Sequence, residues 1–429
     1  MEIKKDKQDI ETLCVQAGYN PKSGEPRVVP VAQSTTYKYD NADLLADLFD
    51  LKTTGHFYTR ISNPTVAALE EKVTALEGGV GSLAAASGQA AIFAAVLNVC
   101  SAGDNIVVAR QIYGGTHNLF NVTLKRFGIE ARFFDTDNIG QIDKLTDGKT
   151  KLIFVESIPN PSIAICDFDK IAEIARKHKV LFFVDNTLAT AALFRPFEHG
   201  ADIIVYSSSK YLDGHAVALG GIIVDSGNFK FKGNARYPEF NTPDASYNNI
   251  VYADKFGKAA YITKARVQIM RDLGAVISPQ NAFLTMLGCE TLALRMKKHS
   301  ENAKAVAEFL KGHSQVEWVN HSSLKDNKYH LVAKKYFKNG TGGIMAFGIK
   351  GGTKAAKQFM KSLKLIAIVT HLADIRTSVI HPASTTHRQL TADELKKSGV
   401  PDNLIRLSVG IENADDLIAD LKQALDKNE

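Results

Sequence analysis

The chain has 429 residues, of which 45% are hydrophobic and 23% are charged, and its formal net charge is +6. These values are ordinary for a globular protein, and the length predicts two domains or one large domain with an appendage. The 52 basic residues are spread along the chain among 46 acidic ones without a compact lysine–arginine block, which argues against nucleic-acid binding.

Several features favour a cytoplasmic protein that does not enter a membrane. The N-terminal segment is charged and lacks the apolar stretch of a secretory signal. The most membrane-like window, residues 81–100, is rich in alanine but is interrupted by Gly, Ser and Gln, which makes a spanning helix improbable. The four cysteines have no metal-ligand spacing, so we expect buried, reduced thiols and no metal site.

The predicted elements alternate after an irregular start. Residues 1–65 are rich in loops and prolines, which indicates an arm rather than a domain. A helix is predicted over PTVAALEEKVTALEG, with Pro64 just before its start and Gly78 just past its end. Short apolar runs then predict five strands: NIVVAR (105–110), ARFFD (131–135), KLIFVES (151–157), VLFFVDNT (180–187) and ADIIVYSSS (201–209). Helices are predicted between them, near 114–127 and 167–178.

Apolar strands without clean alternation, joined by helices, predict an α/β fold with a mostly parallel sheet covered on both faces. Residues 228–275 break this rhythm, since they begin polar and aromatic and become helical near Lys258. Helical periodicity continues through 279–312. The last part of the chain predicts three strands, VEWVN, GGIMAFGIK and NLIRLSVG, and helices near 353–363 and 414–427. We therefore predict a main α/β domain over 66–284 and a smaller α+β domain over 285–429.

Polar side chains follow three of the predicted strands, and ligands bind at the carboxyl ends of strands in open parallel sheets. These residues are Glu156, Asp185, Ser207, Ser209 and Lys210. Each alone has a plain structural explanation, because a carboxylate can cap the next helix and a lysine can reach solvent. Together, a buried acid and a strand-end lysine suit pyridoxal 5′-phosphate (PLP). This cofactor needs a lysine for its Schiff base, an acid at its ring nitrogen and a phosphate cup.

Two stretches are candidates for the phosphate cup. Ser207 and Ser209 alternate along the predicted strand, so both hydroxyl groups could face one phosphate. SGQAAIFAAVLNV (87–99) predicts a Ser-Gly-Gln turn that opens a helix, whose free N–H groups attract an anion. The alternative for this stretch is a helix start that serves only tight packing. Asp185 suits the ring nitrogen, because a dry pocket favours an ionised carboxylate beside a cation.

Seven motifs carry a family resemblance that spans the chain: YTRISNPT (58–65), SGQAA (87–91), YGGT (113–116), VDNT (184–187), YSSSKY (206–211), IHPASTTH (380–387) and RLSVGIE (406–412). The chain resembles the PLP-dependent Cys/Met metabolism (trans-sulfuration) enzymes, and within them most of all the O-acetylhomoserine sulfhydrylases. The resemblance implies fold type I, the fold of aspartate aminotransferase. It also implies a homo-oligomer, at least a dimer, since such enzymes usually form tetramers built from tight dimers.

The resemblance also implies roles for individual residues around the cofactor. Lys210 would be the Schiff-base lysine and the proton shuttle. Four residues would hold the phosphate: Gly88, Gln89, Ser207 and Ser209. Four would contact the ring and its 3′ oxygen: Asp185 at the pyridinium nitrogen, Thr187 beside the ring, Tyr113 stacked on it and Asn160 at the oxygen.

Four more roles concern the neighbouring subunit and the substrate. Tyr58 and Arg60 would reach the phosphate bound in the neighbouring subunit, and Tyr58 and Tyr113 are candidates for assisting proton transfer. Arg406 would hold the substrate carboxylate, helped by Thr377. The residue type supports this, because a guanidinium fork matches a carboxylate in two parallel hydrogen bonds. The alternative for Arg406 is a salt bridge at the rim of the protein.

The reaction implied is γ-replacement, in which O-acetyl-L-homoserine and sulfide give L-homocysteine and acetate, or methanethiol gives methionine. Gly115 stands where methionine γ-lyases of this family typically place a cysteine, and residues 240–275 form a long segment most like that of acetylhomoserine sulfhydrylases.

The alternatives are cystathionine γ-synthase or γ-lyase, methionine γ-lyase and O-succinylhomoserine sulfhydrylase, which share the lysine, aspartate and arginine. The intact cofactor set argues against a non-catalytic interaction protein. The lack of GxGxxG after the first predicted strand argues against a nicotinamide dehydrogenase.

Overall fold

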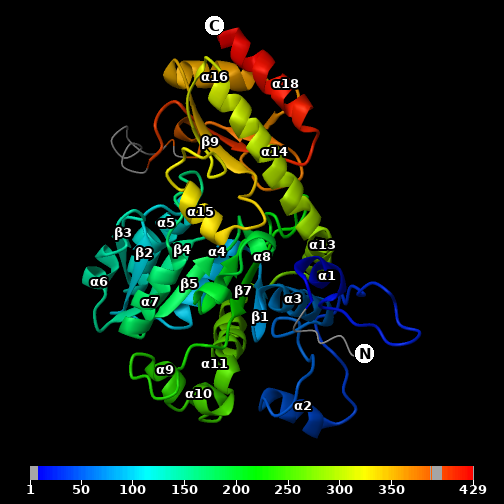
Figure 1. The fold of residues 1–429 in the computed structure, drawn as a ribbon. Coiled ribbons are helices and arrows are strands. Elements are labelled where there is room, and N and C mark those ends of the chain that lie inside the picture. The colour runs from blue at the N-terminus through cyan, green and yellow to red at the C-terminus, as the bar shows by residue number, and fades with distance from the viewer. Residues whose placement is uncertain (1–7, 387, 389–398, 429) are drawn as a thin grey trace.

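The computed structural model describes residues 8–386, 388 and 399–428, which form two sheets with their helices (Figure 1). Residues 1–7 of the predicted arm and residue 387 of the IHPASTTH motif lie outside this range. The larger sheet has the order β1-β7-β6-β5-β4-β2-β3. Its strands are β1 (Gly81–Ala85), β2 (Asn105–Ala109), β3 (Glu130–Phe134), β4 (Thr150–Glu156), β5 (Leu181–Asp185), β6 (Ile203–Tyr206) and β7 (Gly221–Asp225). Strand β7 runs antiparallel to β1 and β6, and the other described pairs of this sheet are parallel.

The central strands of this sheet are covered on both faces. Every residue of β2, β4, β5, β6 and β7 is buried, which a strand achieves only when its two faces are both packed. The surrounding helices are α3 (Pro64–Glu77), α4 (Gly88–Leu97), α5 (Gly114–Asn118), α6 (Gln141–Leu145), α7 (Phe168–His178) and α8 (Thr190–Leu193). The predicted α/β fold with a mostly parallel sheet is confirmed.

Helix starts on both sides of β1 follow from local sequence signals. Asn63 caps α3 by accepting hydrogen bonds from the backbone of Thr65 and Val66, and Pro64 is the first residue of the helix rather than the one before it. Gly78 ends α3 in the left-handed conformation (φ 75°). Ser87 caps α4, as its hydroxyl oxygen accepts a hydrogen bond from Ala90 N–H at 3.2 Å. The predicted Ser-Gly-Gln turn therefore does open a helix.

The smaller sheet lies beside the larger one, in the order β10-β11-β12-β9-β8 (Figure 1). Its strands are β8 (Val316–Asn320), β9 (Ile344–Ile349), β10 (Ala367–Ile368), β11 (Ser378–Ile380) and β12 (Leu404–Ser408). The helices of this part are α14 (Leu292–Gly312), α15 (His330–Tyr336), α16 (Gly352–Ser362) and α18 (Ala414–Leu425). The preceding helix, α13 (Pro279–Glu290), packs on α3. Arg406 on β12 pairs with Ala346 on β9 and Ile380 on β11, so it lies in the middle of the sheet.

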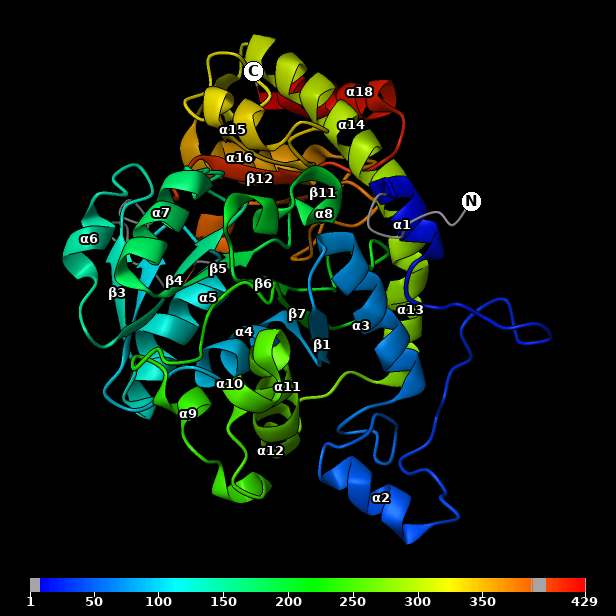
Figure 2. The same ribbon diagram turned by 60° about the horizontal axis from the view of Figure 1, so that its bottom comes forward.

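The remaining segments border the larger sheet. Residues 238–273 contain the short helices α9 (Pro238–Asn241), α10 (Tyr252–Lys255), α11 (Ala260–Lys264) and α12 (Arg271–Leu273). Near the N-terminus, α1 (Ile10–Gln16) packs on α3 and α14. The chain between α1 and α3, including α2 (Ala42–Phe49), extends away from the main body in both views (Figure 2). All four cysteines are buried and free, and no described helix is long and apolar enough to cross a membrane.

Candidate functional site

Three neighbouring strands deliver polar groups to one edge of the larger sheet. Glu156 ends β4, Asp185 ends β5, and the turn that carries Lys210 follows β6. Glu156 and Asp185 are direct partners in the β4–β5 register, so their side chains leave the sheet on the same face. The structure thus brings together the strand-end groups that the sequence indicated.

Asp185 and Glu156 are both buried, and among the described residues neither forms an ion pair. Burial raises the pKa of Asp185 to about 6, against the stabilising hydrogen bonds that it accepts from the hydroxyl and backbone N–H of Thr187. Burial and the neighbouring Asp185 charge raise the pKa of Glu156 well above its usual range. Two adjacent carboxylates do not ionise together readily, so Glu156 takes the proton first and leaves Asp185 as the anion.

The turn after β6 differs from the prediction. Strand β6 ends at Tyr206, and Ser207 to Lys210 fold into a turn in which Gly214 N–H donates to Lys210 O at 2.7 Å. Alternation along a strand therefore does not orient Ser207 and Ser209. Both hydrogen bonds of the Ser209 hydroxyl go to Gly220, since it donates to the carbonyl oxygen at 3.2 Å and accepts from the N–H at 2.9 Å.

A close approach of two backbones forms the candidate phosphate cup. A Cβ atom placed on Gly88 would lie 2.6 Å from Cβ and 2.8 Å from Cα of Ser207. One placed on Gly221 would lie 2.1 Å from the carbonyl oxygen of Ser87. The N-terminus of α4 therefore reaches the turn after β6 only because both positions are glycine. This brings the free N–H groups of a helix start beside Ser207, an arrangement suited to an anion.

Lys210 lies where the two sheets meet. Its Nζ is 3.2 Å from Nδ1 of His371, on the loop between β10 and β11. Burial is the main cause that lowers the pKa of Lys210 to about 8, and the nearby Arg406 lowers it further while Asp374 opposes the shift. A lysine with a depressed pKa can act as a nucleophile and base near neutral pH.

Arg406 is a buried cation with unused hydrogen-bonding capacity. Its Nη2 donates to the carbonyl oxygen of His371 at 3.0 Å, whereas its Nε is buried and has no partner in the described part of the chain. The described residues place no carboxylate in an ion pair with it, so the alternative of a salt bridge at the rim is wrong. Thr377 is differently engaged, because its hydroxyl donates to Glu412 at 2.9 Å and accepts from Gly410 N–H at 2.8 Å.

Two residues that were predicted to contact the cofactor ring, Tyr113 and Asn160, donate backbone hydrogen bonds to Glu156. Tyr113 donates its backbone N–H to Glu156 Oε1 at 2.7 Å, and the residue is 49% exposed. Glu156 also accepts the backbone N–H of Asn160, whose side-chain oxygen is buried without a partner. Gln89 donates to Thr116 at 3.2 Å, so its side chain is held beside this loop.

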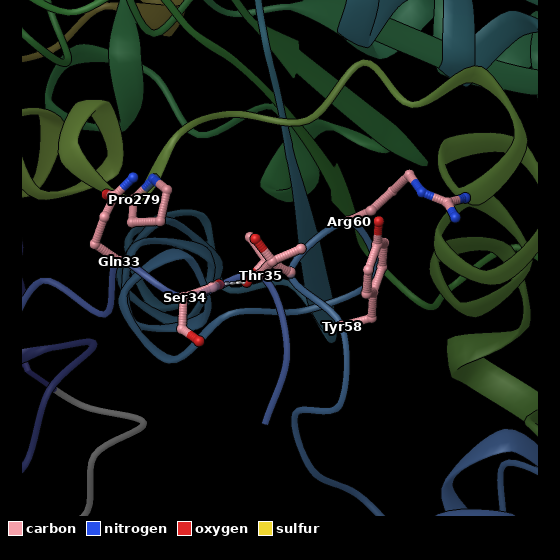
Figure 3. Close-up of a pocket in the computed structure, with 7 residues that line it drawn as sticks. Gln33, Ser34, Thr35, Tyr58, Arg60 and Pro279 are labelled. Atoms are coloured by element: carbon pink, nitrogen blue, oxygen red, sulfur yellow. Dashed lines mark hydrogen bonds between the residues drawn. The ribbon is translucent and has the colours of Figure 1, made fainter. Parts of the chain in front are cut away.

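Tyr58 and Arg60 lie in a separate pocket. They line it together with Gln33, Ser34, Thr35, Thr59 and Pro279 (Figure 3). The guanidinium of Arg60 lies 5.2 Å from the centre of the Tyr58 ring and donates to the carbonyl oxygen of Arg271. None of the strand-end residues lines this pocket, so within one chain the structure does not bring Tyr58 and Arg60 to Lys210.

Sequence reasoning missed His371. It belongs to none of the motifs, and 160 residues separate it from the Lys210 turn, so no local pattern indicates that the two side chains meet. The contact follows only from the packing of the smaller sheet on the larger one. Its Nε2 is buried and has no hydrogen-bond partner among the residues that the structure describes.

These groups fit PLP. Asp185 is the anion of a buried pair that has no ion-pair partner among the described residues, so it matches a protonated ring nitrogen. The Gly88–Ser207 approach offers N–H donors to a phosphate, and Tyr113 is an exposed aromatic residue that could stack on a ring. Lys210 supplies an amine of depressed pKa, and Arg406 supplies buried donors for a carboxylate.

Comparisons with known proteins agree with this chemistry. Residues 11–426 match the family model described as Cys/Met metabolism PLP-dependent enzyme. The chain is 42% identical to homocysteine synthase of Schizosaccharomyces pombe (98% of this chain, 99% of the relative) and 43% identical to O-acetyl-L-homoserine sulfhydrylase of Leptospira meyeri (97% and 96%). A Campylobacter jejuni crystal structure described as an O-acetylhomoserine (thiol)-lyase with a pyridoxyl-lysine phosphate superposes with a TM-score of 0.95 at 44% identity, covering 98% of this chain and all of that one. The chain therefore belongs to the Cys/Met metabolism PLP-dependent enzymes.

Proposed function

We propose that this protein is an O-acetyl-L-homoserine sulfhydrylase that exchanges acetate for sulfide at Cγ and forms L-homocysteine. One observation carries the proposal: Arg406 presents a buried, unpartnered Nε beside the Lys210 amine. A guanidinium that binds the α-carboxylate of an amino acid holds the Cα proton in place beside a base. Near-full-length similarity to proteins named for this reaction supports the choice of substrate.

Lys210 would carry PLP and, once the substrate amine has displaced it, would act as the base at Cα. When bound, the protonated ring withdraws electrons from Cα of the amino acid and so acidifies its proton. Asp185 would keep the ring nitrogen protonated, with Thr187 fixing the carboxylate through two hydrogen bonds. The pKa of about 8 leaves a usable fraction of neutral Lys210 amine at physiological pH.

The remaining residues would position the cofactor and substrate. The helix start at Gly88 and Gln89, with Ser207 and Ser209, would hold the phosphate; for Ser209 this requires its hydroxyl to turn from Gly220. Tyr113 would stack on the ring and Asn160 would meet its 3′ oxygen. Thr377 would assist Arg406 only by releasing Glu412, so we assign the carboxylate chiefly to Arg406.

We also propose that the active form is at least a dimer, with the tetramer as the expected state. Tyr58 and Arg60 lie in a pocket apart from Lys210, on the segment that extends from the main body (Figure 3). This placement supports a site completed in trans, in which the arm of one subunit supplies both residues to the phosphate bound by the other.

Gly115 favours replacement over γ-elimination. A Cβ atom at this position would lie 2.5 Å from Cε1 of Tyr113, so a cysteine there would displace the tyrosine ring. The glycine thus allows the ring its observed position. An enzyme that retains Tyr113 in this place differs from the methionine γ-lyase pattern, in which a cysteine occupies the site.

The test is product analysis with the purified PLP-bound protein. Homocysteine and acetate should form in equal amounts from O-acetyl-L-homoserine and sulfide, faster than from O-succinyl-L-homoserine or with cysteine as the thiol donor. Methanethiol should give methionine if the thiol pocket is roomy. Release of α-ketobutyrate and ammonia as the main products would overturn the proposal in favour of γ-elimination.

A further inference from the structure

The two anchors that we assign to the cofactor lie at the ends of neighbouring strands. Asp185, the anchor for the ring nitrogen, ends β5, and Ser207, beside the phosphate cup, directly follows β6. The ring nitrogen and the phosphate of PLP belong to one covalent framework, so the distance between the two strand ends must match it. Contacts that fix this distance therefore prepare the site before the cofactor binds.

Thr187 joins the two anchors on the side of the cofactor. Its hydroxyl donates to the carboxylate of Asp185, and its backbone N–H donates to the same group at 2.9 Å. The oxygen of the hydroxyl accepts the backbone N–H of Ser207 at 2.8 Å. One residue thus bridges the two strand ends within the site itself.

A second bridge joins the same strand ends through Glu77, the last residue of α3. Asn186, the residue after Asp185, donates its Nδ2 to Glu77 Oε1 at 2.9 Å. Tyr206, the residue before Ser207, donates its hydroxyl to the same oxygen. The Asn186 Nδ2 also donates to the Tyr206 hydroxyl oxygen at 3.0 Å, so the three side chains form a closed set.

This second bridge lies behind the anchors. The N–H of Asn186 continues the β5–β6 pairing by donating to Val205 O at 3.0 Å, so the chain is extended where it leaves β5. Neighbouring side chains of an extended chain point to opposite sides. Asn186 therefore points away from Asp185 and toward α3, where it meets Glu77.

Two features make Glu77 unfavourable for the fold alone. It is buried, where a carboxylate loses its hydration, and it ends α3, where the negative end of the helix dipole repels an anion. Burial raises the pKa of Glu77 to about 7, and the hydrogen bonds from Tyr206 and Asn186 oppose that shift. Residues that break local rules in this way are expected near functional sites, and both partners of Glu77 adjoin the anchors.

We propose that Glu77 is a positioning residue that sets the distance between the ring-nitrogen anchor and the phosphate anchor of the cofactor site. It does so by tying Asn186 and Tyr206 together from behind, and it touches no reacting atom. The inference rests on the proposed assignment of Asp185 to the ring nitrogen and of Ser207 to the phosphate. It does not depend on the acyl group of the substrate or on the reaction that follows.

The first experiment compares two buried tyrosine hydroxyl groups at opposite edges of the same sheet. Tyr206→Phe breaks the bridge at β6. Tyr237→Phe is the matched control, because its hydroxyl accepts Leu181 N–H at 3.1 Å and donates to Lys151 O, at the starts of β5 and β4. The midpoint of urea unfolding should fall in both variants. The Kd of PLP, from fluorescence titration of the cofactor-free full-length protein, should rise by about tenfold in Tyr206→Phe only.

The second experiment changes Glu77 itself. Glu77→Met fills a similar volume without an acceptor, and the Kd of PLP should rise by roughly 10–100-fold. Glu77→Gln keeps an acceptor oxygen for both partners, so PLP affinity should stay within about threefold of wild type. Inorganic phosphate needs only one of the two anchors. Its Kd, from a ³¹P NMR titration, should therefore be the same in Glu77→Met and wild type.

The contrary results are distinct. PLP affinity unchanged in both Tyr206→Phe and Glu77→Met would overturn the inference. So would an equal loss of PLP and phosphate binding, which would confine the damage to the phosphate cup, or a loss in Tyr237→Phe as large as in Tyr206→Phe, which would reflect a loosened sheet. The tyrosine pair decides alone if Glu77→Met does not fold.

Failure of this inference can be told from failure of the proposed function. If Gly88→Ala binds PLP like wild type, the phosphate assignment and the inference are both wrong. If Gly88→Ala loses PLP affinity and Tyr206→Phe keeps it, only the inference is wrong. Release of α-ketobutyrate in place of homocysteine would overturn the proposed reaction and leave the role of Glu77 standing.

Discussion

Glu156 and Asp185 are direct partners in the β4–β5 register, and the two carboxyl groups share one buried face of the sheet. Their surroundings divide their roles. Asp185 accepts two hydrogen bonds from Thr187, which favour its anion, whereas Glu156 receives the repulsion of that anion. Asp185 is therefore the charged acid that can bind a cationic ring. Glu156 is the neutral acid that accepts hydrogen bonds from the backbone N–H groups of Tyr113 and Asn160.

This division predicts losses of kcat of very different size in two amide variants. Asp185→Asn should lower kcat by about 100-fold or more, because a fixed charge at the reacting system is lost. Glu156→Gln keeps an acceptor oxygen and the neutral state, so its kcat should fall by less than about tenfold, since a neutral hydrogen bond contributes about 1 kcal/mol. Steady-state kinetics at saturating PLP provides the comparison. Equal losses would mean that Glu156 works as an anion.

The Gly88–Ser207 approach predicts a cofactor-binding defect. In Gly88→Ala the new methyl group would lie 2.6 Å from Cβ and 2.8 Å from Cα of Ser207, and overpacking of this kind costs about 1–3 kcal/mol. The Kd of PLP should therefore rise by roughly 10–100-fold. Gly148→Ala is the matched control, because a Cβ there meets nothing within 4 Å. Fluorescence titration of the cofactor-free proteins measures both, and unchanged PLP affinity in Gly88→Ala would place the phosphate elsewhere.

The sequence predicted the fold class and most of the central sheet, because buried parallel strands are continuous apolar runs. NIVVAR contains β2 and KLIFVES contains most of β4, within one residue at the ends. It did not predict β1, whose sequence GSLAA lacks β-branched residues. This strand forms because β7 pairs with it, and pairing between distant segments leaves no local pattern.

The candidate site was predictable to the extent that it follows strand ends. Asp185 ends one apolar run and Lys210 follows another after three serines, and their places at one edge of the sheet follow from the α/β fold. The serine turn was misjudged, because hydroxyl groups favour local turns over continuation of a strand. His371 reaches Lys210 from another sheet, so only the packing of the two sheets reveals it.

Burial of Lys210 predicts that stability depends on pH. Its pKa is 10.5 when unfolded and about 8 when folded, so below pH 8 the folded protein must bury an ammonium, at a cost of about 3 kcal/mol, since one pKa unit corresponds to about 1.36 kcal/mol. Between pH 8 and 10.5 the unfolded chain holds the extra proton, so stability from this group rises with pH. Cofactor-free Lys210→Met should exceed wild type in free energy of unfolding by urea at pH 7.

The advantage of Lys210→Met should shrink as the pH approaches 10. The exposed Lys334→Met on α15 is the control and should match wild type at both pH values. An advantage of Lys210→Met that stayed constant from pH 7 to pH 10 would trace to packing of the methionine rather than to the lysine charge.

The free Nε of Arg406 predicts that substrate binding weakens when its planar guanidinium group is replaced by the single ammonium group of lysine. Arg406→Lys should raise KM for O-acetyl-L-homoserine by roughly 10–100-fold, since a hydrogen bond to a charged group contributes about 1.5–3 kcal/mol. The absorbance of bound PLP should not change. Arg126→Lys, on an exposed turn, should behave like wild type. A larger loss in kcat than in KM would show that Arg406 acts mainly in the chemical step.

The separation of Arg60 from Lys210 within one chain predicts complementation between two inactive variants. Lys210→Ala lacks the reacting amine, and Arg60→Met lacks the group that we assign to the phosphate of the neighbouring subunit. In a hybrid dimer, one site carries both lesions and the other carries none, because a two-fold dimer shares each site between its subunits. Random mixing should thus restore roughly a quarter of wild-type activity, as half of the dimers are hybrids with one intact site.

Refolding or subunit exchange of the mixed proteins, followed by a homocysteine assay, measures this recovery. The matched control mixes Lys210→Ala with Asp185→Ala, since both residues belong to the same site of the same chain. Both of these lesions lie in the same chain's half of the site, so each site of their hybrid keeps one lesion and no activity should return. Recovery in that control would point to exchange of whole domains. Failure of the Lys210–Arg60 pair to recover, with hybrids demonstrated by mass spectrometry, would place Arg60 in its own chain's site.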